Sequence, residues 1–438
     1  MKGSLMSFPI HAPSSRRNIW LLFQGHFVSK VGTAVFDIAI VLWMTQHAAA
    51  AGVVGLVMML SKLPEILLGP LAGSIVDMGS RKKVLVLTDL IVGLMVMGLG
   101  LIFLVFSERT SLQFALIVLG AVGIGIGDSF FNPAVSSFIP ELVTQDRLRP
   151  VNSLYRFLTT AATFLGQGLA GLLFAKLGAP LLFLLNGVSY LFSSGSEAGI
   201  ASPRSQAVPN EGLKSTLKSV LMNLREGLVY IRAYEELRNF LLIICLYHFF
   251  VSPFTVILPF YVTDVLRVSP DWYGYLMASF GAGLMIGFIL AGSLKPSGAG
   301  QSALVIGCLG LSALGYLGIG LFPHPVLTLI FILIIGTAIA LIVVTLNTIM
   351  QIATPNAMHG RIFGLYHTLS SASIPVGMGF FGLGLDLLRK VLSSLSLNEA
   401  HGPAIIFQLC GIALSLIVLA MIRKPSFRRF LTIQAAQV

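Results

Sequence analysis

The stretch Gly69–Lys83, GPLAGSIVDMGSRKK, joins two long apolar runs by a short charged turn. Asp77 closes the first run, and Arg81, Lys82 and Lys83 open the second. A turn this short between two helices makes them antiparallel neighbours. A cluster of cations in a short loop is typical of the cytoplasmic side of a membrane. The stretch therefore predicts a helical hairpin and orients the chain.

The composition places the whole chain in a membrane. Its 438 residues are 56% hydrophobic and only 10% charged, whereas a soluble domain carries about 25% charged residues. A bilayer core is spanned by about 20 apolar residues in a helix. We expect an all-α membrane protein with twelve transmembrane helices, near residues 19–44, 52–76, 84–106, 112–135, 153–176, 180–200, 237–263, 272–294, 302–322, 325–350, 362–388 and 403–422.

One long polar stretch divides the helices into six and six. We expect an N-terminal bundle over 1–200, a cytoplasmic linker over 201–236 and a C-terminal bundle over 237–438. Within the linker, over 213–232, apolar residues recur at spacings of three and four between basic residues. This pattern predicts an amphipathic helix along the inner leaflet. A plain connector whose charge serves only topology is an equal alternative.

Loop charge sets the orientation of the bundle. With the N-terminus inside, most of the 28 lysines and arginines fall in cytoplasmic segments, and the outer loops hold only Arg109, Lys176, Arg267, Arg389 and Lys390. The positive-inside rule therefore places both termini in the cytoplasm. The net charge of +11 follows from this topology, so we expect no nucleic-acid partner.

Four ionisable residues lie deep in the first two predicted helices: Lys30, Asp37, Lys62 and Glu65. A charge facing lipid at mid-membrane costs about 2.5–3.5 kcal/mol, so these side chains must face a cavity or one another. Their depths predict the pairs Lys30–Glu65 and Asp37–Lys62. The residues are either static ion pairs or the lining of a translocation path in which a carboxylate binds a proton or a cationic substrate. Asp128 in the fourth helix is a third candidate carboxylate.

Other chemistry is not indicated by the sequence. No phosphate-binding loop occurs, and no cysteines or histidines have metal-ligand spacing. We therefore expect no enzyme, no cofactor and no metal. Asp89 begins the third helix near the cytoplasm and is expected to be only a local cap or ion-pair partner. His248 is a lone helical histidine and is expected to be a core polar group.

The turn and several other segments resemble the major facilitator superfamily. Gly73, Asp77, Arg81, Lys82 and Lys83 match its motif between helices 2 and 3, with Met78 in place of the usual cation. The resemblance is closest to the branch of drug and siderophore exporters, which includes macrolide efflux proteins and the enterobactin exporter. It is carried by SKVGTAVFDIA, NPAVSSFIPELVTQDRL, VNSL, LREGLVYIRAYEELRN, ILPFYVTDVL, TPNAMHGRIFGL and PVGMGFFGLGLD.

This resemblance implies alternating access between two pseudo-symmetric bundles. Helices 1, 4, 7 and 10 would line the central cavity, which gives as candidates Asp37, Asp128, His248 and Asn347, with Phe36, Phe249 and Phe254 between them. It also implies a gate in which Asp77 and Arg81 latch onto the start of helix 11 near Gly360 and Arg361. Gln167 stands where the antiporters of the superfamily carry a helix 5 proline, and helix 4 has no arginine.

We expect a monomeric exporter of amphiphilic or hydrophobic small molecules, driven by protons, in the bilayer of a bacterial inner membrane. The alternatives are a transporter of siderophores or lysophospholipids and, in another class, a non-transporting receptor or scaffold. The motif argues against a scaffold, because a scaffold has no need to switch states.

Overall fold

The computed structural model describes residues 15–47, 50–106, 108–144, 147–201, 229, 234–294, 296, 298–353, 359–423 and 431. These residues form helices and contain no strand. Among them, 11 helices are long and apolar enough to cross a membrane. The predicted amphipathic helix in the linker lies outside the described residues, as does nearly all of 201–236.

The first half of the chain consists of long helices joined by short turns. They are α1 (Ser15–Gln46), α2 (Ala51–Met78), α3 (Arg81–Val105), α4 (Thr110–Leu142) and α5 (Leu148–Ala198). Helix α3 begins after Ser80, whose side-chain oxygen accepts a hydrogen bond from the backbone of Lys83 at 3.4 Å. A serine in this position satisfies one of the backbone N–H groups that a helix start leaves without an acceptor. The predicted turn between the second and third helices is therefore confirmed. The expectation that these two helices are close neighbours is wrong, because α2 packs on α4 and α3 packs on α5.

Helix α5 contains two of the predicted spans. Gly178 interrupts it with a φ of 70°, and Pro180 follows two residues later. A positive φ is accessible to glycine without steric cost, and proline lacks the N–H that would continue the helix. The chain therefore reverses at Gly178, between the predicted spans 153–176 and 180–200. Counting α5 as two gives the twelve helices expected from the sequence.

The second half consists of α7 (Glu235–Val251), α8 (Pro253–Val256), α9 (Leu258–Phe260), the π-helical segment η2 (Tyr261–Val265), α10 (Asp271–Ser293), α11 (Ala299–Leu321), α12 (Pro325–Ala353), α13 (His359–Ser394), the 3₁₀ turn η4 (Glu399–His401) and α14 (Gly402–Arg423). The first four of these form one interrupted membrane span. Pro253 and Pro259 stand at its breaks, since a proline removes a backbone donor from the helix.

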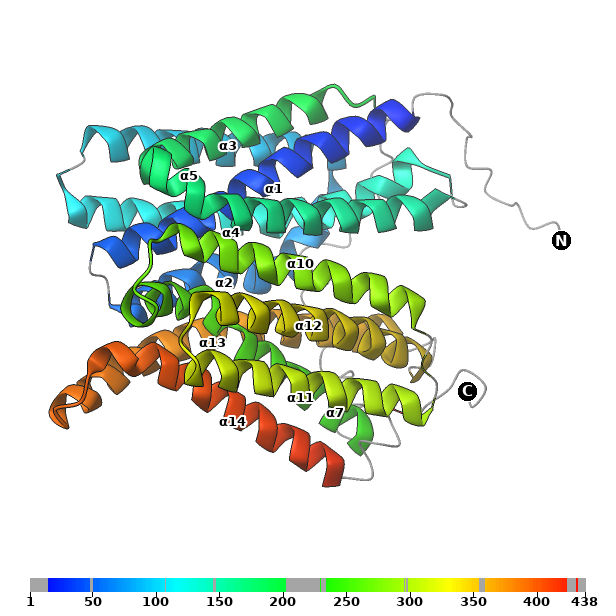
Figure 1. Ribbon diagram of the computed structural model, residues 1–438. Helices are drawn as coiled ribbons and strands as arrows, with labels where there is room; N and C mark the ends of the chain where they lie inside the picture. Colours follow the sequence, from blue (N-terminus) through cyan, green and yellow to red (C-terminus); the bar gives the residue numbers. More distant parts are fainter. Residues whose placement is uncertain are drawn as a thin grey trace.

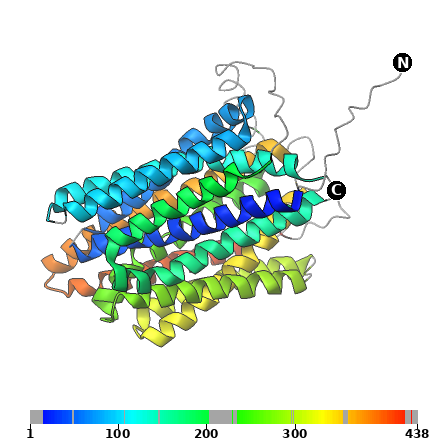
Figure 2. The same cartoon turned by 90° about the horizontal axis from the view of Figure 1, so that it is seen from above.

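The two halves pack as separate bundles that touch along two seams. In the first half, α1 and α3 pack on α5, and α2 packs on α4. In the second half, α10 and α11 pack on α12, and α14 packs on α11. Figures 1 and 2 show the helices side by side and running lengthwise through both bundles. Helix α13 packs on α2, and α10 packs on α5, across the two halves.

Helix α1 begins and α14 ends at the same side of the molecule (Figure 1). We call this side the terminal face; it includes Ser15, Met78, Arg81 and Arg423. The other side, which we call the opposite face, includes Gln46, Ala51 and the bend at Gly178. The two names fix the ends of the helices without assuming which side is cytoplasmic.

Candidate functional site

Charged and polar side chains of α1, α2 and α4 meet inside the first bundle. Lys30 Nζ lies 3.0 Å from Asp128 Oδ1, and Lys62 Nζ lies 3.5 Å from Asp37 Oδ2. Glu65 accepts a hydrogen bond of 2.8 Å from the side-chain amide of Asn132. We call these six residues the charged network.

The structure brings the predicted intramembrane charges together but changes one pairing. The expected pair Asp37–Lys62 is confirmed. The expected pair Lys30–Glu65 is wrong, because Lys30 is bonded to Asp128 of α4. Two residues seven apart on α1 share one face, and this face meets both α2 and α4. The sequence showed the spacing of seven residues between Lys30 and Asp37, but it did not show that α4 also contacts this face of α1.

The network is only partly buried. The side chains of Lys62 and Asp37 are 36% and 29% exposed, whereas those of Lys30 and Asp128 are 21% and 12% exposed. Such partly open ion pairs at membrane depth mark paths for ions or substrates more often than they mark lipid-facing surface. The Asp37–Lys62 pair is therefore the more accessible part of the network.

His26 closes the network on the side of the terminal face. It is 3% exposed, and its Nε2 is hydrogen-bonded to the hydroxyl of Tyr155 at 3.1 Å. Its ring stacks on Phe131 and Tyr155 at centroid distances of 4.8 and 5.4 Å. The histidine is thus wedged between aromatic rings of α4 and α5.

The expected lining residues of the second half are placed unequally. His248 holds its Nδ1 2.9 Å from the carbonyl of Ile244, as expected of a core polar group. Asn347 is half-buried on α12. Phe249 is half-buried and packs on Phe380 and Phe381 at centroid distances of 5.2 and 5.0 Å.

Two of the three aromatic residues expected in the cavity belong to the packed core instead. Phe36 is 1% exposed and contacts Phe183 at a centroid distance of 4.6 Å. Phe254 is 3% exposed and lies against Tyr316 at 5.1 Å. Their apolar neighbours on adjacent helices, which the sequence does not reveal, bury both rings.

The turn after α2 is tied to its own bundle. Arg81 forms an ion pair with Glu141 of α4. Lys82 donates hydrogen bonds of 2.7 and 2.6 Å to the carbonyls of Ala198 and Ile200 at the end of α5. Lys83 is exposed. Gly73 faces α4, since a Cβ there would lie 3.9 Å from that of Pro133.

The predicted latch between this turn and α13 stays a prediction. The side chains of Asp77 and Arg361 and the surroundings of Gly360 lie outside what the structure describes. The contacts of Arg81 and Lys82 show only that the turn is anchored to α4 and α5.

At the opposite face, a carboxylate of the second half binds the start of α2. Asp386 of α13 accepts hydrogen bonds from the backbone N–H groups of Ala51 at 2.9 Å and Gly52 at 2.7 Å. Ala50 offers no side-chain cap, so Asp386 supplies the acceptor that a helix start requires. A carboxylate at this position also interacts favourably with the helix dipole. No motif or spacing in the sequence indicated this contact, which joins residues 335 apart.

Glycines bring the two halves into direct backbone contact near Asp386. A Cβ on Gly382 would lie 2.4 Å from the carbonyl oxygen of Ala51, and one on Gly55 would lie 2.3 Å from that of Met378. On the other seam, a Cβ on Gly171 of α5 would lie 3.0 Å from the backbone nitrogen of Gly274 of α10. Small residues permit this approach in membrane proteins. The halves are therefore closely packed toward the opposite face.

A small cavity remains in this closed region. It measures about 220 Å³ and lies between the end of α1 and the π-helical segment, with Thr45, Gln46, Thr263, Asp264 and Tyr273 among its lining residues. Pockets for drug-sized ligands are about 300–1,000 Å³, so this cavity is smaller than a binding site for such a ligand.

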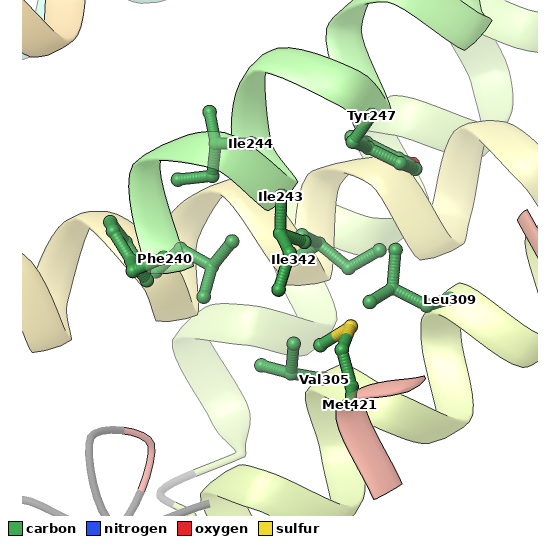
Figure 3. Close-up of a pocket in the computed structure, with 9 residues that line it drawn as sticks. Phe240, Ile243, Ile244, Tyr247, Val305, Leu309, Ile342 and Met421 are labelled. Carbon is green, nitrogen blue, oxygen red and sulfur yellow. The ribbon is translucent and has the colours of Figure 1, made fainter. Parts of the chain in front are cut away.

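A second cavity lies within the second bundle and is apolar. Figure 3 shows side chains of α7, α11, α12 and α14 converging on it, among them Phe240, Ile342, Leu309 and Met421. Its volume is about 10 Å³, which is about the minimum for one water molecule. We interpret it as a packing void.

Comparisons with known proteins agree with this architecture. Residues 9–422 match the family described as transmembrane secretion effectors. Macrolide efflux protein A of Streptococcus pyogenes is 22% identical over 369 residues, which cover 84% of this chain and 89% of that protein. Multidrug efflux pump Tap of Mycolicibacterium fortuitum is 23% identical over 372 residues, covering 83% and 88%.

Solved structures share the fold. A bacterial homologue of the human lysosomal transporter Spinster, in an inward-facing and unoccupied conformation, superimposes with a TM-score of 0.73 at 15% identity. The match covers 96% of this chain and 98% of that chain. A bacterial homologue of the iron transporter ferroportin, also inward-facing, gives a TM-score of 0.67 at 16% identity, covering 93% and 100%.

Two bundles of membrane helices that meet along close seams, with a charged network inside the first bundle, define a multi-pass membrane transporter of the major facilitator superfamily. Within that class, the chain belongs to the family of transmembrane secretion effectors. The expectations of a transporter and of no enzyme are confirmed, since the family and its relatives are transporters. Proteins of this class carry small molecules across a membrane.

Proposed function

We propose that this protein exports amphiphilic or hydrophobic small molecules by alternating access and that export is coupled to protons. It would act as a monomer in a bacterial inner membrane, with both termini in the cytoplasm. The observation that carries the proposal is the charged network, in which Asp37 and Glu65 lie at membrane depth with partly exposed or neutral partners.

The network supports proton coupling through the nature of its partners. Asp37 is held by Lys62 at 3.5 Å, which is longer than a typical charge-assisted hydrogen bond of about 2.7–2.9 Å. Glu65 has a neutral amide as its bonded partner. A carboxylate whose partner is a distant cation or a neutral donor loses less interaction energy on protonation than a carboxylate in a tight ion pair. Asp37 and Glu65 therefore suit proton uptake better than Asp128, which Lys30 holds at 3.0 Å.

The seams support alternating access. The glycine contacts and the Asp386 cap close the molecule toward the opposite face. With the orientation predicted from loop charge, that face is extracellular, and the state is inward-facing. A transporter must also open this face, so the seams would separate during the cycle.

The substrate class is proposed from two sources. The similar proteins named above are a macrolide efflux protein and a multidrug efflux pump. The candidate helices α7 and α12 carry mainly apolar side chains, with His248 and Asn347 among their few polar groups. A largely apolar site with few polar groups is typical of sites for amphiphilic ligands.

The test is flux of a radiolabelled macrolide in proteoliposomes with and without an imposed pH gradient. We expect gradient-driven flux in the wild type and its loss in Asp37→Asn and Glu65→Gln. Glu399→Gln is the matched control, because Glu399 is exposed on the opposite face. Unchanged coupling in both network variants would overturn their role as proton carriers.

Two further outcomes would replace the proposal. Flux of a siderophore or a lysophospholipid, without any effect of the pH gradient, would favour the alternative substrates. Absence of flux for every substrate in a protein that still binds them would favour a receptor.

A further inference from the structure

Two acidic residues of the first bundle lie buried outside the charged network. Asp89 of α3 is 2% exposed, and Glu197 of α5 is fully buried. Within the described part of the chain, Oδ2 of Asp89 and both carboxyl oxygens of Glu197 have no hydrogen-bond partner. The expectation that Asp89 is a local cap or ion-pair partner is therefore wrong. Asp89 lies eight residues inside α3, and Glu197 was not singled out in the sequence.

The two carboxyl groups face the same seam between α3 and the last part of α5. The Ser194 hydroxyl donates to the carbonyl of Val86 at 2.9 Å, and Lys82 donates to the carbonyl of Ala198 at 2.7 Å. Helix residues three, four and seven apart share a face. Asp89 follows Val86 by three and Lys82 by seven, and Glu197 follows Ser194 by three. Both side chains thus enter the seam that these hydrogen bonds define.

Ser193 adds a third unpartnered group to this seam. It is fully buried and lies beside the carboxyl group of Asp89, but its hydroxyl makes no hydrogen bond of good geometry. A Cβ on Gly25 of α1 would lie 3.1 Å from this hydroxyl. Helix α1 therefore covers the seam from the side of the charged network.

The ionisable groups around the pair, on each helix packed against it, are engaged elsewhere. On α1 and α4, Lys30 and Asp128 bind each other at 3.0 Å. On α1 and α5, His26 is bonded to Tyr155 at 3.1 Å. Two more are Lys82 of α3, which donates to the carbonyls at the end of α5, and Tyr190 of α5, which is bonded to the hydroxyl of Thr33 at 2.9 Å.

Burial without a cation decides the protonation of the pair. An ionised carboxylate that is buried without a partner costs several kcal/mol, and two that face each other add repulsion. A neutral carboxylic acid avoids both the cost of burying a charge and the repulsion, and it becomes a hydrogen-bond donor as well as an acceptor. We propose that Asp89 and Glu197, with Ser193 beside them, form a buried proton-binding site separate from the charged network.

A proton fits this site better than a metal cation. Hard cations such as Mg²⁺ and Ca²⁺ take about 6–8 oxygen ligands. The site offers four unpartnered oxygen atoms, which are Oδ2 of Asp89, both carboxyl oxygens of Glu197 and the hydroxyl of Ser193. A proton on each acid removes the buried charge and supplies hydrogen-bond donors to these atoms, without a coordination shell.

The site lies close to the terminal face. Glu197 is one residue from the end of α5, and Lys82 binds the carbonyls that follow it. Asp89 lies about 12 Å from the start of α3 at 1.5 Å per residue. Protons therefore enter from this face when the last turn of α5 opens. Loss of the proton places like charges in the seam and loosens the contact of α1 with α5. The link to transport rests on the proposed function, but the binding of protons does not.

Infrared spectroscopy of the purified full-length protein tests the site. The carbonyl stretch of protonated carboxylic acids is recorded in H₂O and D₂O over a pH series for the wild type, Asp89→Asn, Glu197→Gln and the double variant. We expect a protonated-acid band in the wild type that shrinks in each single variant and loses the pair's contribution in the double variant. Asp128→Asn removes a carboxylate of an ion pair and should leave the band unchanged.

A second measurement covers variants that fold poorly. The wild-type melting temperature should fall as the pH is raised, because deprotonation puts unpaired charge into the seam, and Glu197→Gln should show a smaller fall. A wild type without the band would overturn the proposal, as would a band in the double variant that is as strong as in the wild type. A melting temperature that rises with Na⁺ at constant ionic strength in the wild type, but not in the double variant, would also overturn it by showing a cation site.

The outcome separates this proposal from the proposed function. Proton-driven flux without the infrared band would leave the charged network as the coupling site and reject the carboxyl pair. The band without any proton-driven flux would confirm a proton-binding site in a protein whose transport has another driving force.

Discussion

Asp386→Asn tests whether the opposite face is held closed by a helix cap that crosses the two halves. The wild-type carboxylate accepts from Ala51 and Gly52 at 2.9 and 2.7 Å. Asparagine keeps one acceptor oxygen and removes the negative charge, with little change in volume. The substitution removes the charged partner of the start of α2. It therefore destabilises only the closed state, in which residue 386 contacts α2.

The size of the effect follows from two contributions. Hydrogen bonds to charged groups contribute about 1.5–3 kcal/mol, against about 0.5–1.5 kcal/mol for neutral ones. A charge at a helix end contributes up to about 2 kcal/mol in partly buried geometry. Because one oxygen still accepts, we expect a net loss of about 1–2 kcal/mol from the closed state. This corresponds to a shift of about 5–30-fold toward the open state.

Distances between spin labels on the two halves measure this shift. Thr110→Cys and Asn398→Cys carry the labels, because both residues are exposed on the opposite face. Cys245 is replaced by serine, since it is the one native cysteine that is not buried. We expect the population with the longer distance to grow about 5–30-fold in Asp386→Asn. Glu399→Gln removes an exposed carboxylate of the same face and should leave the distances unchanged.

The reasoning fails if the distance distribution of Asp386→Asn equals that of the wild type. It fails equally if the distances change to the same extent in Glu399→Gln, since the effect would then come from surface charge. A change in Asp386→Asn alone identifies the cap as an element that holds the closed state.

Three further predictions concern close contacts and ion pairs. Gly382→Ala places a Cβ 2.4 Å from the carbonyl oxygen of Ala51 and should open the same face in the same labelling experiment, whereas Gly384→Ala, which has nothing within 4 Å, should not. Gly171→Ala should weaken the other seam and also lengthen the label distance, since its Cβ would meet the backbone of α10 at 3.0 Å. Lys30→Met leaves Asp128 unpaired and should destabilise the protein by about 3 kcal/mol in detergent unfolding, and the double variant with Asp128→Asn should recover most of that loss. Equal stability of the single and double variants would contradict the assigned pair.

The sequence predicted the fold because membrane helices leave a strong local signal. Runs of about 20 apolar residues, the bend at Gly178 and the turn before Arg81 are each encoded within a few neighbouring residues. The pair Asp37–Lys62 was predictable for a similar reason, since two antiparallel neighbours bring residues of similar depth together.

Contacts between distant helices could not be predicted in this way. Asp128 displaced Glu65 as the partner of Lys30 because α4 approaches the same face of α1 as α2 does. Asp386 lies 335 residues from its partner, and Glu197 is buried by α3 and α1 together. One sequence gives the depth of a residue in the membrane but not the rotation of each helix about its axis, which tertiary packing decides.

Helix α2 connects the parts of the molecule that a transport cycle must coordinate. Its start is bound by Asp386 of the other half, its middle carries Lys62 and Glu65 of the charged network, and the turn at its end is held by the ion pair of Arg81. A rigid helix transmits displacement along its length, so separation of α2 from α13 at the opposite face must shift Lys62 against Asp37. That bond, at 3.5 Å, is the longest in the network and the least costly to break. Opening of the face and release of the Asp37 carboxylate are therefore expected to occur together, which is the linkage that proton-coupled export requires.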